Sequence, residues 1–195
     1  MEKIIQKALS ESIGVKEDFI KENTTKITFF AEKIALALTS DRKLLLCGNG
    51  GSAADAQHIA AEFINRYELE RPPLPAIALT TDTSILTSVG NDYSFDEIFS
   101  KQVKALGVEG DVLLAISTSG NSANVIEAVK SAKSLGIFTV GLTGGEGGQL
   151  KRLVDLSLVV KSNVTARIQE THILVGHIIC ELVDYLLFQQ GVPEG

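Results

Sequence analysis

The chain has 195 residues, of which 45% are hydrophobic and 22% charged, and its formal net charge is −6 at pH 7. This length and composition are typical of one globular domain with a sizeable core, and they exclude a disordered chain. The negative charge, with no block of Lys or Arg, argues against non-specific binding to nucleic acid or to an anionic membrane surface.

The ends of the chain carry no pattern of export or membrane insertion. The N-terminus lacks a basic segment followed by an apolar stretch, so we expect no signal peptide. The longest apolar run near the C-terminus is interrupted by His177 and Glu181, so we expect no membrane span. Cys47 and Cys180 lie in apolar runs, which favours buried thiols over a disulfide. These features together predict a cytoplasmic protein.

Residues 2–39 carry apolar side chains at helical spacing, such as Ile27, Phe30 and Ile34. We expect two helices here, forming an N-terminal helical arm over residues 1–40. Two interpretations are open: the arm packs on a neighbouring subunit, or it covers the sheet of its own chain.

From residue 41 onward, short apolar runs alternate with helical patterns. The predicted strands are 43–47, 76–79, 111–116, 138–142 and 156–160. The predicted helices are 52–66, 83–89, 95–106, 122–134 and 166–190. Short strands without polar alternation are typical of an α/β fold with a five-stranded, mostly parallel sheet flanked by helices. We therefore expect a single domain over 1–195, with an α/β core at 41–195, that binds ligands beyond the carboxyl ends of its strands.

The first strand runs into a glycine-rich loop, Gly48-Asn49-Gly50-Gly51-Ser52. Glycine permits a sharp turn and a close approach to a ligand, and Asn tolerates a left-handed conformation. We place Ser52 at the N-cap of the next helix, where free amides attract anions. The third glycine of a dinucleotide fingerprint is missing, so we interpret the loop as a sugar-phosphate loop.

A second loop, after the predicted strand 111–116, carries the hydroxyls of Ser117, Thr118, Ser119 and Ser122. Hydroxyls and free helix amides can together surround a phosphate without Lys or Arg. The alternative is a capped turn, but four hydroxyls within six residues exceed what capping needs. The pattern favours phosphate binding.

Four further polar side chains lie on predicted helices. His58 and Glu62 are four residues apart, so they share one helix face and could share a cation such as zinc; such pairs are also common without a ligand. His177 lies in an apolar run, so we expect it to be buried, with a core histidine bonded to a carbonyl as the alternative. Gln169 precedes it by about 12 Å along a helix, so the two can meet one ligand only from above and below or from different subunits.

Four segments make the chain recognisable: Gly48–Ser52, Gly90-Asn91-Asp92, Ser117–Ser122, and Arg167-Ile168-Gln169-Glu170 followed two residues later by His172. In this order they resemble the phosphoheptose isomerases of the sugar isomerase (SIS) domain family, over nearly the whole chain. The resemblance implies a flavodoxin-like three-layer sandwich and a homotetramer with active sites between subunits. It implies aldose–ketose isomerisation of sedoheptulose 7-phosphate to D-glycero-D-manno-heptose 7-phosphate, through an enediol, for bacterial heptose and lipopolysaccharide biosynthesis.

The resemblance also implies roles for individual residues. Catalysis would fall to Glu62, as the base, and to His177, which would move protons on the sugar oxygens. The implied substrate contacts are Asn49, Gly50, Gly51, Ser52, Glu62, Asn91, Asp92, Ser117, Thr118, Ser119, Ser122 and Gln169. One zinc ion per subunit would be held by His58, Glu62, Gln169 and His177.

Two rival functions use the same fold. Residues 62–80 and 105–118 are also similar to non-catalytic SIS proteins that bind the replication initiator. The resemblance implies that such proteins lack the Glu and His found here at positions 62 and 177, which favours the enzyme. The second rival is a sugar-phosphate sensor that uses the same loops without chemistry.

Overall fold

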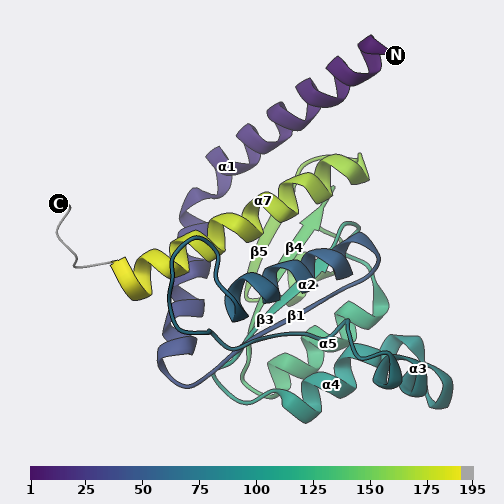
Figure 1. The fold of residues 1–195 in the computed structure, drawn as a ribbon. Coiled ribbons are helices and arrows are strands. Elements are labelled where there is room, and N and C mark those ends of the chain that lie inside the picture. The colour runs from purple at the N-terminus through teal and green to yellow at the C-terminus, as the bar shows by residue number, and fades with distance from the viewer. Residues whose placement is uncertain (190–195) are drawn as a thin grey trace.

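The computed structural model describes residues 1–189, which form a five-stranded parallel sheet between two layers of helices (Figure 1). The strands are β1 (Leu44–Gly48), β2 (Ala76–Ala78), β3 (Val112–Ser117), β4 (Phe138–Gly144) and β5 (Leu156–Val160). The helices are α1 (Glu2–Thr39), α2 (Gly51–Ile64), α3 (Thr83–Asp92), η1 (Phe95–Glu97), α4 (Ile98–Leu106), α5 (Ala123–Ser134), α6 (Leu150–Leu153), α7 (Thr165–Asp184) and η2 (Tyr185–Gln189). The predicted α/β class, with its five parallel strands, is confirmed.

The strand order β2-β1-β3-β4-β5 places a switch point between β1 and β3. From β1 the chain runs outward to β2 at one edge, and it then crosses back to β3 on the other side. The register pairs Leu46 of β1 with Leu114 of β3, and Gly48 with Ile116, so both strands end at the same level. The loops that follow β1 and β3 therefore leave the sheet side by side.

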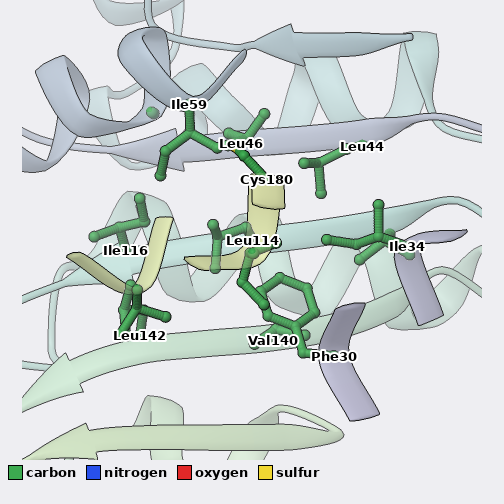
Figure 2. Packing of buried hydrophobic residues seen from close by; sticks show 14 of the residues in the cluster. Phe30, Ile34, Leu44, Leu46, Ile59, Leu114, Ile116, Val140, Leu142 and Cys180 are labelled. Atoms are coloured by element: carbon green, nitrogen blue, oxygen red, sulfur yellow. The ribbon is translucent and has the colours of Figure 1, made fainter. Parts of the chain in front are cut away.

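Each central strand is buried on both faces, which explains its unbroken apolar sequence. Leu44 and Leu46 face the layer of α1, α2 and α7, whereas Leu45 and Cys47 face the layer of α4 and α5. Figure 2 shows the first of these two cores, where Ile59 of α2 and Cys180 of α7 meet the strand side chains. Burying one such side chain contributes about 1.5–3 kcal/mol, so the sheet is held by packing on both sides. Both cysteines are buried and free, as predicted.

The N-terminal region is one helix of 38 residues, so the prediction of two helices was wrong. No proline interrupts it, and Asn23 and Thr24 donate their side chains to carbonyls one turn back, which keeps them within the helix. Its C-terminal half covers the sheet through residues such as Phe30 and Ile34. Its N-terminal half projects away from the body (Figure 1) and exposes apolar side chains such as Ile5.

One other expectation needs correction. α3 continues through Gly90, Asn91 and Asp92, whereas we predicted a helix that ends at residue 89, because Tyr93 N still donates to the Val89 carbonyl. By length and composition, residues Thr165–Gln189 could cross a membrane. This segment packs against α1 and α2, so its apolar composition is explained by its place as a core helix.

Candidate active site

The loops after β1 and β3 are joined by a reciprocal amide pair. Asn49 Nδ2 donates to Asn124 Oδ1 and Asn124 Nδ2 donates to Asn49 Oδ1, each at 2.9 Å. Asn124 lies in the first turn of α5 and is buried. The pair fixes the glycine-rich loop against the hydroxyl-rich loop at the switch point, where ligands bind in sheets of this kind.

Ser52 is not the N-cap of α2, contrary to our prediction. The helix begins at Gly51 with Gly50 as its N-cap, and the amide of Ser52 already donates to the Asn49 carbonyl within the first turn. The side chain of Ser52 is buried. Its predicted substrate contact therefore remains a prediction, and the exposed groups of this loop are the backbone of Gly50 and Gly51.

The hydroxyls after β3 gather into one cluster. Ser117 Oγ lies 2.9 Å from Ser122 Oγ and 3.4 Å from Ser119 Oγ. Ser122 is the N-cap residue of α5, yet its side chain makes no capping hydrogen bond. In the described part of the chain, the hydroxyl of Thr118 makes no hydrogen bond. Ser117 is buried, so Thr118, Ser119 and Ser122 are the hydroxyls of this cluster that are open to an anion.

An open hollow of about 350 Å³ lies beside this cluster. Its lining includes Thr118, Ser119, the glycines after β4 and Thr165 at the start of α7. A larger hollow of about 850 Å³ lies between α5 and α6, but it contains none of the predicted site residues. The smaller hollow is therefore the better candidate for a phosphate group.

The second cluster forms where α2 and α7 lie side by side (Figure 1). His58 Nε2 lies 3.0 Å from His177 Nε2, although the two residues are 119 positions apart, and 3.3 Å from Glu62 Oε1. Tyr67 stacks on the His177 ring with centroids 5.7 Å apart. One chain thus brings three of the predicted catalytic and metal-ligating side chains together.

Gln169 lies at the other end of this helix pair. A Cβ on Gly51 would lie only 2.2 Å from Gln169 Nε2, so the amide occupies the space that glycine leaves open. It therefore lies at the start of α2, whereas His58 and His177 meet two turns further along. Within one chain Gln169 is separated from the histidine pair.

Asn91 and Asp92 lie at the exposed end of α3, where Asn91 Nδ2 donates to Asp92 Oδ1 at 2.9 Å. Over residues 1–189 they make no side-chain hydrogen bond to either loop at the switch point. Their predicted role as substrate contacts stays a prediction.

The burial that we expected for His177 is found at the other histidine of α7, His172. His177 is only partly buried, whereas His172 is fully buried and pairs through Nε2 with the Thr143 carbonyl at 3.1 Å. Burial lowers the pKa of His172 to about 4, and the bond to the carbonyl opposes this shift in part. His172 is therefore the neutral core histidine, and His177 is open to a ligand.

The donor chemistry of the second cluster suits zinc. Imidazole nitrogens and a carboxylate are typical zinc ligands, and ligands at about 2.0–2.1 Å in a tetrahedron lie about 3.3 Å from one another. The spacings of His58 to His177 and of His58 to Glu62 fit this value. Among residues 1–189, however, no group of three His, Cys, Asp or Glu side chains is arranged to hold a metal ion. The set within one chain is thus incomplete.

Sequence reasoning missed several residues of the site. Asp55 lies one turn before His58, and burial raises its pKa to about 6, against the opposing effect of His58. Asn124 and Tyr67 also escaped notice, since a single Asn in a helix and a Tyr in a connector carry no pattern. Only Asp55 had a usable signal: it shares the helix face of His58 and Glu62 at three-to-four spacing.

The fold and the two clusters define a class, and comparison with known proteins agrees with it. The profile of the SIS domain family matches residues 9–144. A phosphoheptose isomerase of Nitratidesulfovibrio vulgaris is 55% identical over 179 residues, which cover 92% of this chain and 86% of that protein. The structure of a phosphoheptose isomerase from Neisseria gonorrhoeae is 49% identical, with a TM-score of 0.89 over 94% of this chain and 98% of that chain. The one from Francisella tularensis is 43% identical, with a TM-score of 0.90 over 93% and 97%. The chain belongs to the phosphoheptose isomerases of the SIS domain family.

Proposed function

We propose that this chain catalyses the aldose–ketose isomerisation of sedoheptulose 7-phosphate to D-glycero-D-manno-heptose 7-phosphate. The observation that carries the proposal is the pairing of two clusters in a member of this family: His58, Glu62 and His177 on two helices, and four hydroxyls at the neighbouring strand end. One cluster supplies proton transfer and the other supplies an anion site.

The reaction requires a proton to leave C1 of the ketose and a proton to arrive at C2. Glu62 is the proposed base: it takes the C1 proton, which leaves an enediol, and it then delivers a proton to C2. His177 moves a proton from the hydroxyl at C1 to the oxygen at C2, so that C1 ends as the aldehyde. Positioned acid–base groups of this kind contribute typically about 10²–10⁴-fold to the rate.

The phosphate is five carbons away from the reacting pair and takes no part in the chemistry. We propose that Ser117, Thr118, Ser119 and Ser122 bind it together with the free amides at the start of α5. Anchoring the far end of the substrate converts its binding energy into correct placement of C1 and C2.

We propose that each subunit binds one zinc ion through His58, Glu62 and His177, with Gln169 of a neighbouring copy as the fourth ligand. This arrangement would account for the separation of Gln169 from the histidine pair within one chain. When bound, zinc would polarise the sugar oxygens as a Lewis acid. The same reasoning supports a homotetramer with active sites between subunits, in which Asn91 and Asp92 reach a neighbour's substrate.

The place of the reaction in the cell follows from its product. We propose a cytoplasmic enzyme whose heptose phosphate enters bacterial heptose and lipopolysaccharide biosynthesis. Neither nucleic acid nor a membrane is a proposed partner, since the net charge is −6.

The test is an assay of the purified protein with sedoheptulose 7-phosphate in D₂O, followed by NMR. We expect an aldose product with deuterium at C2, loss of turnover after treatment with a chelator, and recovery with added zinc. Binding of the sugar phosphate without interconversion would favour the function of a sugar-phosphate sensor over that of an enzyme. Pull-down of the replication initiator by a protein without turnover would favour the non-catalytic alternative. Light scattering of the same sample measures the oligomeric state.

A further inference from the structure

A buried ion pair lies at the far end of the α2–α7 contact. Arg71, in the connector between α2 and β2, donates from Nε to Asp184 Oδ1 of α7 at 2.8 Å. The Arg71 side chain is 2% exposed and that of Asp184 is 6% exposed. Removing two charges from water is costly, so a pair of this kind needs further hydrogen bonds to compensate.

Arg71 finds those bonds at the C-terminal end of α2. Its Nη1 donates to the Phe63 carbonyl at 2.7 Å and its Nη2 to the Glu62 carbonyl at 2.9 Å. The last carbonyls of a helix have no partner within the helix, and they form the negative end of its dipole. A planar guanidinium can serve this end and a carboxylate at once, because its donors point in several fixed directions.

The two anchor points of Arg71 lie close to the proposed acid–base pair. One is the backbone of Glu62 itself. The other, Asp184, follows His177 by seven residues, which is two helical turns along the same face of α7. The helices also touch beside the histidine pair, since a Cβ on Gly176, next to His177, would lie 2.6 Å from Cδ1 of Ile59, next to His58. The guanidinium therefore ties the end of one helix to a fixed place on the other.

We propose that Arg71 is a positioning residue, which sets the register of α2 against α7 and so the separation of Glu62 from His177. This inference rests on the proposed function for its effect on turnover, and it deepens that function by adding a residue outside the two clusters. The competing view is that the pair only stabilises the fold.

The experiment compares three variants at 25 °C, after circular dichroism has shown which of them fold. Arg71→Lys keeps the charge but loses the planar fork, and Asp184→Asn keeps the shape but loses the carboxylate. The matched control is Val103→Ala, which removes packing from the core on the opposite face of the sheet. We expect kcat to fall roughly ten- to hundredfold in Arg71→Lys and less in Asp184→Asn, because small displacements of catalytic groups have effects of this size. The KM should stay close to the wild-type value, and Val103→Ala should lose melting temperature but keep kcat.

A second measurement does not depend on turnover. The chain has three histidines, so ¹⁵N-labelled histidine gives a simple NMR spectrum. With a chelator present, we expect the ring signals of His58 and His177 to move in Arg71→Lys, because their 3.0 Å contact depends on the helix register. The signal of His172, which pairs with Thr143, should stay in place.

The two measurements separate the possible failures. If the wild-type protein shows no isomerase activity, the proposed function fails, and the histidine signals still test the register. Both ion-pair variants could instead lose stability but keep kcat and the His58 and His177 signals, which is the behaviour expected of Val103→Ala. The pair would then be only structural, and the proposal would be overturned. If Arg71→Lys does not fold, Asp184→Asn decides by the same criteria.

Discussion

The two clusters of the site are built in opposite ways. The hydroxyl cluster comes from six consecutive residues at the end of β3, and its members are held by their own turn. The second cluster, in which we propose Glu62 and His177 as the acid–base pair, joins residues 119 positions apart, and its geometry exists only because α2 packs on α7. Covalent neighbours keep their spacing when packing changes, whereas groups on two helices do not. We therefore expect changes in the loop to alter substrate binding and changes between the helices to alter turnover.

The largest expected effect belongs to Glu62→Gln. The amide keeps the size and polarity of the side chain but cannot accept the C1 proton. We expect kcat to fall by about 10²–10⁴-fold with little change in KM or melting temperature. Steady-state kinetics with sedoheptulose 7-phosphate measures this loss.

The control for this change is Glu181→Gln, an exposed carboxylate one turn after His177 on α7. It removes the same charge near the same helix and should leave kcat at the wild-type value. Turnover retained in Glu62→Gln would remove Glu62 from the role of base.

His172 fixes α7, the helix that carries His177, to the sheet, because it pairs with the Thr143 carbonyl on β4. Its pKa is about 4 in the folded protein, against 6.5 for the free side chain. Between these pH values the unfolded chain therefore binds more protons than the folded chain. The contribution of His172 to the unfolding free energy is complete above pH 6.5 and is lost as the pH falls toward 4. The full shift corresponds to about 3 kcal/mol of unfolding free energy.

The pH effect is measured by urea unfolding of the wild type and of His172→Asn between pH 4 and 7. Asp55 acts in the opposite sense, because its raised pKa of about 6 increases stability as the pH falls. The difference between the two proteins removes this background. An unchanged pH slope in His172→Asn would contradict the assignment of His172 as the buried neutral histidine.

Asn124→Ala tests the link between the two strand-end loops. It leaves the amide of Asn49 without its reciprocal partner, which should cost about 1–3 kcal/mol of unfolding free energy. Because both loops are proposed to contact the substrate, KM should rise while kcat changes little. Asn23→Ala is the matched control: it removes another buried Asn, bonded within α1 to the Phe19 carbonyl, and should lower stability without raising KM.

The sequence predicted what depends on local pattern. The five strands came from short apolar runs, and the hydroxyl loop was visible because its groups are contiguous. The spacing of His58 and Glu62 also placed them on one face of one helix. These features depend on neighbours in the chain, so periodicity and spacing are enough to find them.

What the sequence could not supply depends on packing between distant segments. His172 and His177 both lie in apolar surroundings in the sequence, and only the packing of α7 decides which one is buried. The pairing of Arg71 with Asp184 joins a connector to a helix 113 positions away, and no spacing rule predicts it. α1 is one long helix where we predicted two, because residues 2–39 contain no proline to end a helix. Helical periodicity alone does not show whether such a stretch forms one helix or two.

The smallest expected effect concerns the hydroxyl cluster, through Thr118. Thr118→Val removes the one hydroxyl of the cluster that, in the described residues, makes no hydrogen bond within the protein. One hydrogen bond to a charged group is worth about 1.5 kcal/mol at the lower end, so KM should rise roughly tenfold. An interaction made equally in the ground state and the transition state leaves kcat unchanged. Thr28→Val on α1, whose hydroxyl donates to the Thr24 carbonyl, is the control and should change neither constant. A fall in kcat with constant KM would show that this loop acts on the reacting carbons, and the division of labour between the two clusters would then be wrong.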